Sequence, residues 1–201
     1  MSRYRGPRLR ITRRLGELPG LVGEKISVKP NPPGQHGSLP QKPSQYSLRL
    51  REKQKLRFHY GVNEGQLVNY VKKARRSLGS TGEKVLQLLE MRLDTIIFRG
   101  GFAPSIRASR QLVTHGHIKV NNERVNIPSF QCTPGDTFQI DVQNRVDQML
   151  KGGSPNGTSL TPHLRLDSKT LTGEITKIVS RENVSCPVNE FLIIEYYSRK
   201  V

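Results

Sequence analysis

Five cationic and hydrogen-bonding side chains near the middle of the chain have spacings that can bring them onto one surface. Arg107, Arg110 and Gln111 share one face of a predicted helix. His117 and Lys119 share one face of the predicted strand that follows it. Converging donors of this kind suit the phosphate backbone of a folded nucleic acid. The predicted chemistry is therefore phosphate binding, not bond making or breaking.

The overall charge points to the same class of partner. The chain has 201 residues with 33 Lys and Arg against 16 Asp and Glu, a net charge of +17, and a pI near 10.4. Residues 1–60 hold 14 of these cations against 3 acids. Such a field favours a polyanion, and nucleic acid is the leading candidate. An anionic membrane would need a sustained apolar or amphipathic segment, which the sequence lacks, so no membrane partner is predicted.

Residues 1–43 are predicted to form an irregular basic arm. Pro30, Pro32, Pro33 and Gly34 stand among seven Pro and Gly residues that prevent a long helix from about 29 to 43. With few apolar residues, the arm is expected to order only when phosphates neutralise it. The alternative is a solvated charged tail. The amino terminus has no apolar segment typical of a secretory signal and does not resemble a long transit peptide.

Three helices are predicted after the arm. Residues 44–60 form the first, which ends at Gly61 and carries a stripe of Arg49, Lys53 and Arg57. Repulsion within this stripe favours an anionic partner, although a solvated helix face would give the same pattern. The next two helices begin at capping pairs, which are Asn63 with Gln66 and Ser80 with Glu83.

Residues 92–142 are predicted to fold as helix, helix and short strands. One strand turns at Asn121–Asn122, and the strand interior is expected to consist of Val125, Ile127, Phe138, Ile140 and Val142. The run 191–198 is predicted to be a further strand. The fold class is α+β, with an arm at 1–43, a helical body of 44–91 with about 143–201, and an inserted RNA-binding domain at 92–142. This domain is expected to be two helices packed on a small twisted sheet.

The inserted segment resembles the αL-type RNA-binding motif. The matching residues are RLD at 92–94, RASRQLV at 107–113, HIKVN at 117–121 and VNIPS at 125–129. This motif also occurs beside catalytic domains in some pseudouridine synthases and tyrosyl-tRNA synthetases, and in small stress proteins, so it does not settle function alone.

The resemblance to one family spans the whole chain. SRYRGPRLRITRR at 2–14, GQHG at 34–37, LREKQKLRFHYGV at 50–62, GSTGE at 79–83 and NEFLIIEYYSRK at 189–200 resemble small-subunit ribosomal protein four. The opening and the EYYSRK segment look most like its plastid-encoded form. The resemblance implies a structural constituent that binds the 5′ domain of 16S-type rRNA early in assembly. It also implies a neighbour, small-subunit ribosomal protein five, and a position near the path by which mRNA enters.

In such a protein, Lys and Arg neutralise phosphates, and Tyr and His stack on or hydrogen-bond to splayed nucleotides. The predicted rRNA-binding residues are Arg3, Tyr4, Arg5, Arg8, Arg13, Arg14, Gln35, His36, Arg49, Lys53, Lys55, Arg57, Tyr60, Arg92, Arg107, Arg110, Gln111, His115, His117, Lys119, Asn121, Ser129 and Arg199. Some family members bind zinc through cysteines in the arm, which has none here, so no metal and no cofactor are predicted. The segment GSLPQKP at 37–43 is poor in cations, which argues against an mRNA-unwinding role.

Other functional classes fit less well. No catalytic domain, HExxH motif, Gly-rich phosphate loop or paired-carboxylate spacing accompanies the RNA-binding motif, so the chain is not expected to be an enzyme. An extra-ribosomal regulator that binds mRNA would have the same basic surface and stays open. Cys132 and Cys186 are expected to be reduced and buried. A homo-oligomer is not expected, and the predicted location is the chloroplast small ribosomal subunit, or otherwise a bacterial-type cytoplasmic ribosome.

Overall fold

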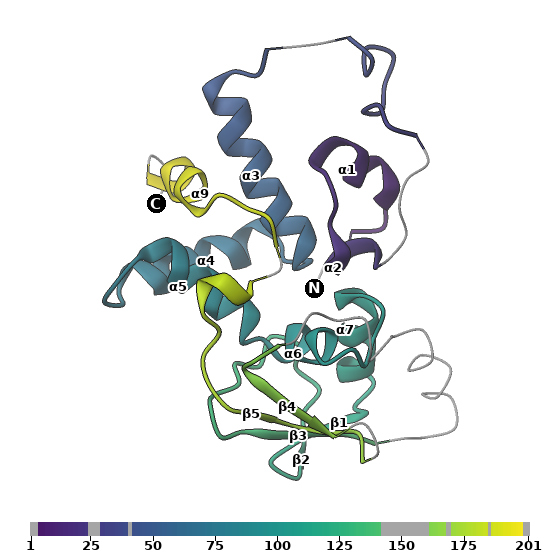
Figure 1. Ribbon diagram of the computed structural model, residues 1–201, viewed down its shortest axis with the longest axis vertical. Helices are drawn as coiled ribbons and strands as arrows, with labels where there is room; N and C mark the ends of the chain where they lie inside the picture. The colour runs from purple at the N-terminus through teal and green to yellow at the C-terminus, as the bar shows by residue number, and fades with distance from the viewer. Residues whose placement is uncertain are drawn as a thin grey trace. The chain divides into compact units, whose positions relative to one another are not determined.

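The computed structural model describes residues 4–23, 29–39, 42–141, 161–167, 170–184 and 186–198 (Figure 1). The chain divides into two compact units. The first consists of residues 1–85 with 186–201, and the second of residues 86–185. Helices form the first unit, and helices with an antiparallel sheet form the second, which confirms the α+β class.

Local signals set the helix starts of the first unit. Helix α3 (Gln45–His59) begins where the Ser44 side chain accepts a hydrogen bond from the Ser47 amide. Helix α4 (Glu64–Arg75) begins at the predicted capping box, in which Asn63 and Gln66 satisfy each other's backbone amides. Helix α5 (Thr81–Glu90) follows and runs past the boundary between the units.

The arm is more ordered than the sequence predicted. It contains helix α1 (Arg8–Leu15) and the single turn α2 (Pro19–Val22). Leu15, Leu18 and Leu21 are buried as one cluster, and the Phe58 ring of α3 packs against it. The prediction of an irregular arm was wrong here because these few apolar residues are buried against α3.

The carboxyl-terminal run is a helix, α9 (Glu190–Ser198), and the predicted strand was wrong. Its buried residues are Ile193, Tyr196 and Tyr197, which have helical spacing and pack against α3. Aromatic and β-branched residues favour strands, but packing against a neighbouring helix outweighs that propensity.

The second unit packs two helices with a five-stranded sheet. Helices α6 (Leu93–Arg99) and α7 (Ile106–Thr114) contact each other. All strand pairs are antiparallel, in the order β2-β1-β3-β5-β4. The strands are β1 (Ile118–Val120), β2 (Glu123–Arg124), β3 (Thr137–Ile140), β4 (Leu164–Asp167) and β5 (Thr172–Ile175), and a short 3-10 helix, η1 (Arg181–Asn183), comes after them.

The strands correct the predicted domain boundary. Because β5 pairs with β3, the sheet continues past residue 142, and the unit extends to residue 185. The predicted turn is present, with positive φ at Asn121 and Asn122 of 50° and 68°. Ile127 was predicted to be interior, but it lies in a loop and is 56% exposed. Val142 lies outside the described residues.

The cysteines and the helix lengths complete the description of the fold. Cys132 and Cys186 form no disulfide within the described residues, and both are buried. None of the helices in the described ranges combines the length and the apolar character that a bilayer span requires.

Candidate nucleic-acid interface

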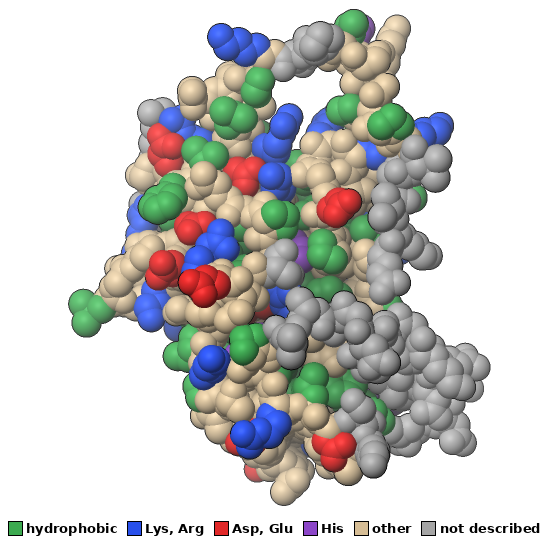
Figure 2. Space-filling view, in the orientation of Figure 1, with side chains coloured by type: hydrophobic (Ala, Val, Ile, Leu, Met, Phe, Trp, Pro, Cys, Tyr) green, Lys and Arg blue, Asp and Glu red, His purple; other side chains and the backbone are tan. Residues whose placement is uncertain are grey.

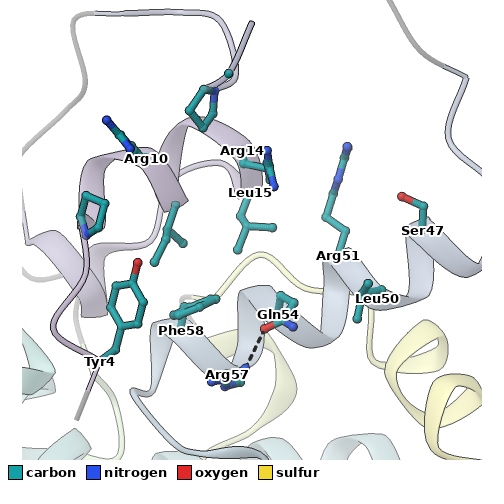
Figure 3. A pocket seen from close by; sticks show the side chains of 14 residues that line it. Tyr4, Arg10, Arg14, Leu15, Ser47, Leu50, Arg51, Gln54, Arg57 and Phe58 are labelled. Carbon is teal, nitrogen blue, oxygen red and sulfur yellow. Dashed lines mark hydrogen bonds between the residues drawn. The ribbon is translucent and has the colours of Figure 1, made fainter. Parts of the chain in front are cut away.

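A cleft between α1 and α3 gathers four arginine side chains in the first unit (Figure 3). It has a volume of about 720 Å³, and its lining includes Arg10 and Arg14 from α1 and Arg51 and Arg57 from α3. Among the residues that the structure describes, no Asp or Glu lines it. We call this space the α1–α3 cleft.

The arginines of the α1–α3 cleft differ in their surroundings. Arg10, Arg14 and Arg51 are exposed, and within the described ranges their guanidinium groups have no hydrogen-bond or ion-pair partner. Figure 3 shows Arg14 and Arg51 facing each other from the two helices. Arg57 donates to Gln54 Oε1 at 3.4 Å, and its guanidinium carbon lies 5.2 Å from the centre of the Phe58 ring. Such a cluster attracts anions strongly.

Apolar and aromatic side chains form the rest of the lining. Leu15 lies between the helices with Phe58 (Figure 3), and Ile11 and Leu50 also line the cleft. The Tyr4 ring is 42% exposed and meets the Phe58 ring edge-on at 5.3 Å between centroids. The cleft therefore offers both cationic and aromatic surface.

The opposite side of α3 is neutralised by acids. Arg49 binds Glu195 of α9, and Lys55 binds Glu52 at 2.7 Å. The Lys53 ammonium group is 2.8 Å from Glu64 and is almost fully buried. In Figure 2, red acidic side chains gather over α9 and α4. Folding provides each of these three cations with a carboxylate, and the RNA contacts predicted for them stay a prediction.

Glu64 links three helices of the first unit. Its carboxylate also accepts a hydrogen bond from the Tyr197 hydroxyl at 2.8 Å. Desolvation raises the pKa of Glu64, but the hydrogen bonds from Lys53 and Tyr197 outweigh it and leave the pKa below its usual value. The neighbouring Tyr60 side chain has no exposed surface, so its predicted stacking on a nucleotide was wrong.

The turn at 31–39 is attached to α1. Arg13 donates to the carbonyl oxygens of Asn31 at 2.8 Å and Pro32 at 3.5 Å. Arg13 therefore positions the turn instead of standing free. Gln35 and His36 are exposed on the turn, as a contact with a ligand would require.

In the second unit, helix α7 presents the predicted side chains along one line. Arg107, Gln111 and His115 are four residues apart, so they share one face of the helix. The His117 ring lies 6.1 Å from that of His115. We call these four residues the α7 surface. Arg107 is exposed, and nothing in the described part of the chain pairs with its guanidinium group.

Arg92 and Arg110 belong to the interior and not to the α7 surface. Both donate to the carboxylate of Asp94, which is fully buried, through contacts of 2.6 to 3.0 Å. The exposed side-chain fraction is 1% for Arg92 and 12% for Arg110. A buried carboxylate must be neutralised, and these two arginines neutralise it, so their predicted role as rRNA contacts stays a prediction without support from their position.

Asn121 also has an internal role. Its side chain donates to Asp136 and accepts from the Thr137 amide, both at 2.9 Å, which fixes the turn between β1 and β2. Lys119 remains half-exposed, with its ammonium group 3.4 Å from Asp141.

The other predicted residues divide by position. Arg5 and Arg8 are exposed on the arm, where Arg8 also donates to the Leu21 carbonyl at 3.4 Å, and Ser129 is half-buried in a loop. Arg3 and Arg199 lie outside the described residues. Arg10 and Arg51 were not predicted. The four-residue spacing of Arg10 and Arg14 was a usable signal, but it has meaning only if the arm is helical.

The described residues offer no metal site of the usual kind. No group of three or more His, Cys, Asp or Glu side chains within these ranges could hold a metal ion. The candidate interface therefore consists of cations, aromatic rings and hydrogen-bond donors.

Comparison with known proteins finds two successive family matches along the chain. Residues 3–90 match the family described as ribosomal protein S4/S9 N-terminal domain, and residues 91–138 match the S4 domain. The α1–α3 cleft lies in the first match and the α7 surface in the second. The chain is thus an S4-domain protein with a ribosomal S4/S9-type amino-terminal domain.

Full-length relatives identify the family. Over 203 aligned residues, the chain is 58% identical to small ribosomal subunit protein uS4 of Thermosynechococcus vestitus and 56% identical to small ribosomal subunit protein uS4c of Nephroselmis olivacea. Each alignment covers 100% of both chains. The uS4c protein of Gracilaria tenuistipitata is 54% identical over 202 residues. The chain belongs to the family of small ribosomal subunit protein uS4, which confirms the resemblance described above.

Proposed function

We propose that this chain is a structural constituent of the small ribosomal subunit and binds the 5′ domain of 16S-type rRNA. The observation that carries the RNA-binding role is a set of arginines with no acidic partner among the residues that the structure describes. Arg10, Arg14 and Arg51 in the α1–α3 cleft and Arg107 on the α7 surface are exposed. Shape and phosphate contacts, rather than base sequence, would dominate such recognition.

Relatives named uS4 and uS4c support a ribosome of plastid or bacterial type. Within that choice we propose the plastid, because the opening residues and the EYYSRK segment resemble the plastid-encoded form. Early binding during assembly, contact with small-subunit ribosomal protein five and proximity to incoming mRNA follow from the family resemblance and are proposed on that ground. A structural role accounts for the chain without any catalytic activity.

The first test compares two RNAs over a range of salt concentrations. The full chain is titrated with a 5′-domain fragment of 16S-type rRNA and with an unrelated structured RNA of equal size. If the four exposed arginines each contact a phosphate, affinity should fall about 50- to 150-fold between about 50 and 200 mM salt. A preference of several orders of magnitude for the ribosomal fragment is the expected result. Equal affinity for both RNAs would refute a specific rRNA-binding role.

A variant pair tests the assignment of the cleft. Arg14→Gln combined with Arg51→Gln should reduce the magnitude of the salt slope by about 1.5, as expected for two lost phosphate contacts. The matched control is Arg165→Gln, because Arg165 is 78% exposed but lies 3.5 Å from Glu174 in the sheet. Equal effects of the variant pair and the control would place the RNA elsewhere.

An extra-ribosomal regulator is the second candidate, since the same cationic surface could bind an mRNA. Quantification of the chain in purified small subunits separates the two functions. One copy per subunit supports the structural role, and a substoichiometric amount supports the regulator.

A further inference from the structure

We infer that the α1–α3 cleft receives one unpaired nucleotide of the RNA partner, with its base against Tyr4 and its flanking phosphates on Arg14 and Arg51. This inference rests on the proposed function and specifies what the cleft recognises. A surface that contacts only the outer phosphates of a duplex has no use for the apolar lining. Besides docking the arm on α3, the apolar lining suits a ligand with an uncharged, flat part as well as negative charge.

The dimensions of the cleft fit a ligand of that size. Its volume of about 720 Å³ lies within the range of about 300–1,000 Å³ that is usual for small-molecule sites. Ile11, Leu15 and Leu50 supply apolar walls below the exposed guanidinium groups. An unstacked base with the sugar and phosphates attached to it matches this order of surfaces, apolar inside and cationic outside.

The two aromatic rings have different roles in this arrangement. Phe58 is half-buried, because it packs against the cluster of Leu15, Leu18 and Leu21. Tyr4 is 42% exposed and is held edge-on against Phe58, at an interplanar angle of 75°. Tyr4 is thus the ring with a free face for a base, and Phe58 supports it. Single-stranded RNA is commonly recognised by stacking of splayed bases on such rings and on arginine planes.

A glycine allows the position of the Tyr4 ring. A Cβ atom placed on Gly6 would collide with the Tyr4 hydroxyl and the adjacent ring carbon. The ring therefore folds back over its own backbone and contacts Phe58 of α3. Without this packing, a tyrosine at the start of a basic arm would be mostly solvated. This local packing keeps the Tyr4 ring in the lining of the cleft.

The closing experiment separates stacking from charge. The full chain and its variants are titrated with the 5′-domain rRNA fragment at several salt concentrations. Tyr4→Leu should weaken binding by about 5- to 100-fold, the loss expected for one stacked base, and leave the salt slope unchanged. Tyr4→Phe should bind like the original chain. The matched control is Phe191→Leu, because Phe191 is 77% exposed on α9 and is not part of the cleft.

A second experiment with small ligands distinguishes the possible outcomes. Binding of uridine monophosphate, inorganic phosphate and a Glu-rich peptide is followed through NMR shifts of residues in the cleft. Stronger binding of the monophosphate than of phosphate, lost in Tyr4→Leu, supports the inference. Full rRNA affinity in a folded Tyr4→Leu variant overturns the inference about the cleft, and the proposed function still stands. Preferential binding of the peptide overturns the same inference. Loss of rRNA preference in the unmodified chain overturns the proposed function itself. Circular dichroism confirms that each variant is folded.

Discussion

The strongest prediction concerns Asp94, whose carboxylate lies between two arginines. Asp94→Asn keeps the size and one acceptor oxygen of the side chain but removes its charge. In the original chain, the Nε and Nη2 groups of Arg92 and Arg110 all donate to this carboxylate. In the variant, two guanidinium groups would remain close together without the negative charge of this carboxylate.

The size of the effect follows from burial. Asp94 has no exposed side-chain surface, and Arg92 has only 1%. Removal of one partner from a buried ion pair costs about 3–5 kcal/mol, because the remaining charge stays desolvated. For a unit of about this size, each kcal/mol lowers Tm by about 4–8 °C. We therefore expect the Tm of the second unit to fall by at least about 12 °C.

The assay is thermal and urea unfolding, followed by circular dichroism. The matched control is Asp141→Asn, because Asp141 is exposed and its distance to Lys119 is 3.4 Å. The control should change the free energy of unfolding by less than about 0.5 kcal/mol. Arg92→Met combined with Asp94→Leu should recover part of the loss, since it removes the buried carboxylate together with the more buried cation. An Asp94→Asn variant as stable as the control would refute this account of the interior.

Three smaller predictions concern titration and reactivity. The pKa of Glu64 is lowered, so this residue contributes fully to stability above its ordinary pKa of 4.5, and the contribution is lost as pH falls through the lower folded-state pKa. Glu64→Gln should therefore reduce the loss of unfolding free energy at acidic pH, as measured by urea unfolding. Burial lowers the pKa of His163 from its ordinary value of 6.5, so stability should decline as pH falls below 6.5, and His163→Gln should reduce this decline between about pH 7 and 5.5. Burial raises the pKa of the Cys132 thiol to about 12, and nearby Asp136 and Asp94 add to the shift. A thiol reagent at about pH 8 should therefore label Cys132 in denaturant but not in the folded chain, as mass spectrometry would show.

The elements that the sequence predicted well have local causes. Ser44 caps α3, Asn63 and Gln66 cap α4, and the pair Asn121–Asn122 forms the turn after β1. Each of these signals lies within a few residues of the structure it specifies. Such features can be read from one sequence without knowledge of the fold.

The errors arose where distant residues decide the outcome. Whether the run 191–198 is helical depends on its packing against α3, and its residues alone favour a strand. The role of Arg49 depends on Glu195, which lies 146 residues away. The leucines of the arm are too few to form a core alone. They become buried because they dock on Phe58, which lies in a later helix. No spacing rule within one segment contains this information.

The acids, more than the cations, determine where RNA can bind. A net charge of +17 predicts a polyanionic partner but does not say which arginines face it. Asp94 and Glu195 turn neighbouring arginines into structural groups, as Glu64 does for a lysine. Among the described residues, no carboxylate lines the α1–α3 cleft, so its arginines keep their charge available for a ligand. The binding surface of this chain therefore consists of the cations that do not pair with a buried or packed carboxylate. Sequence alone does not show which cations are paired in the fold.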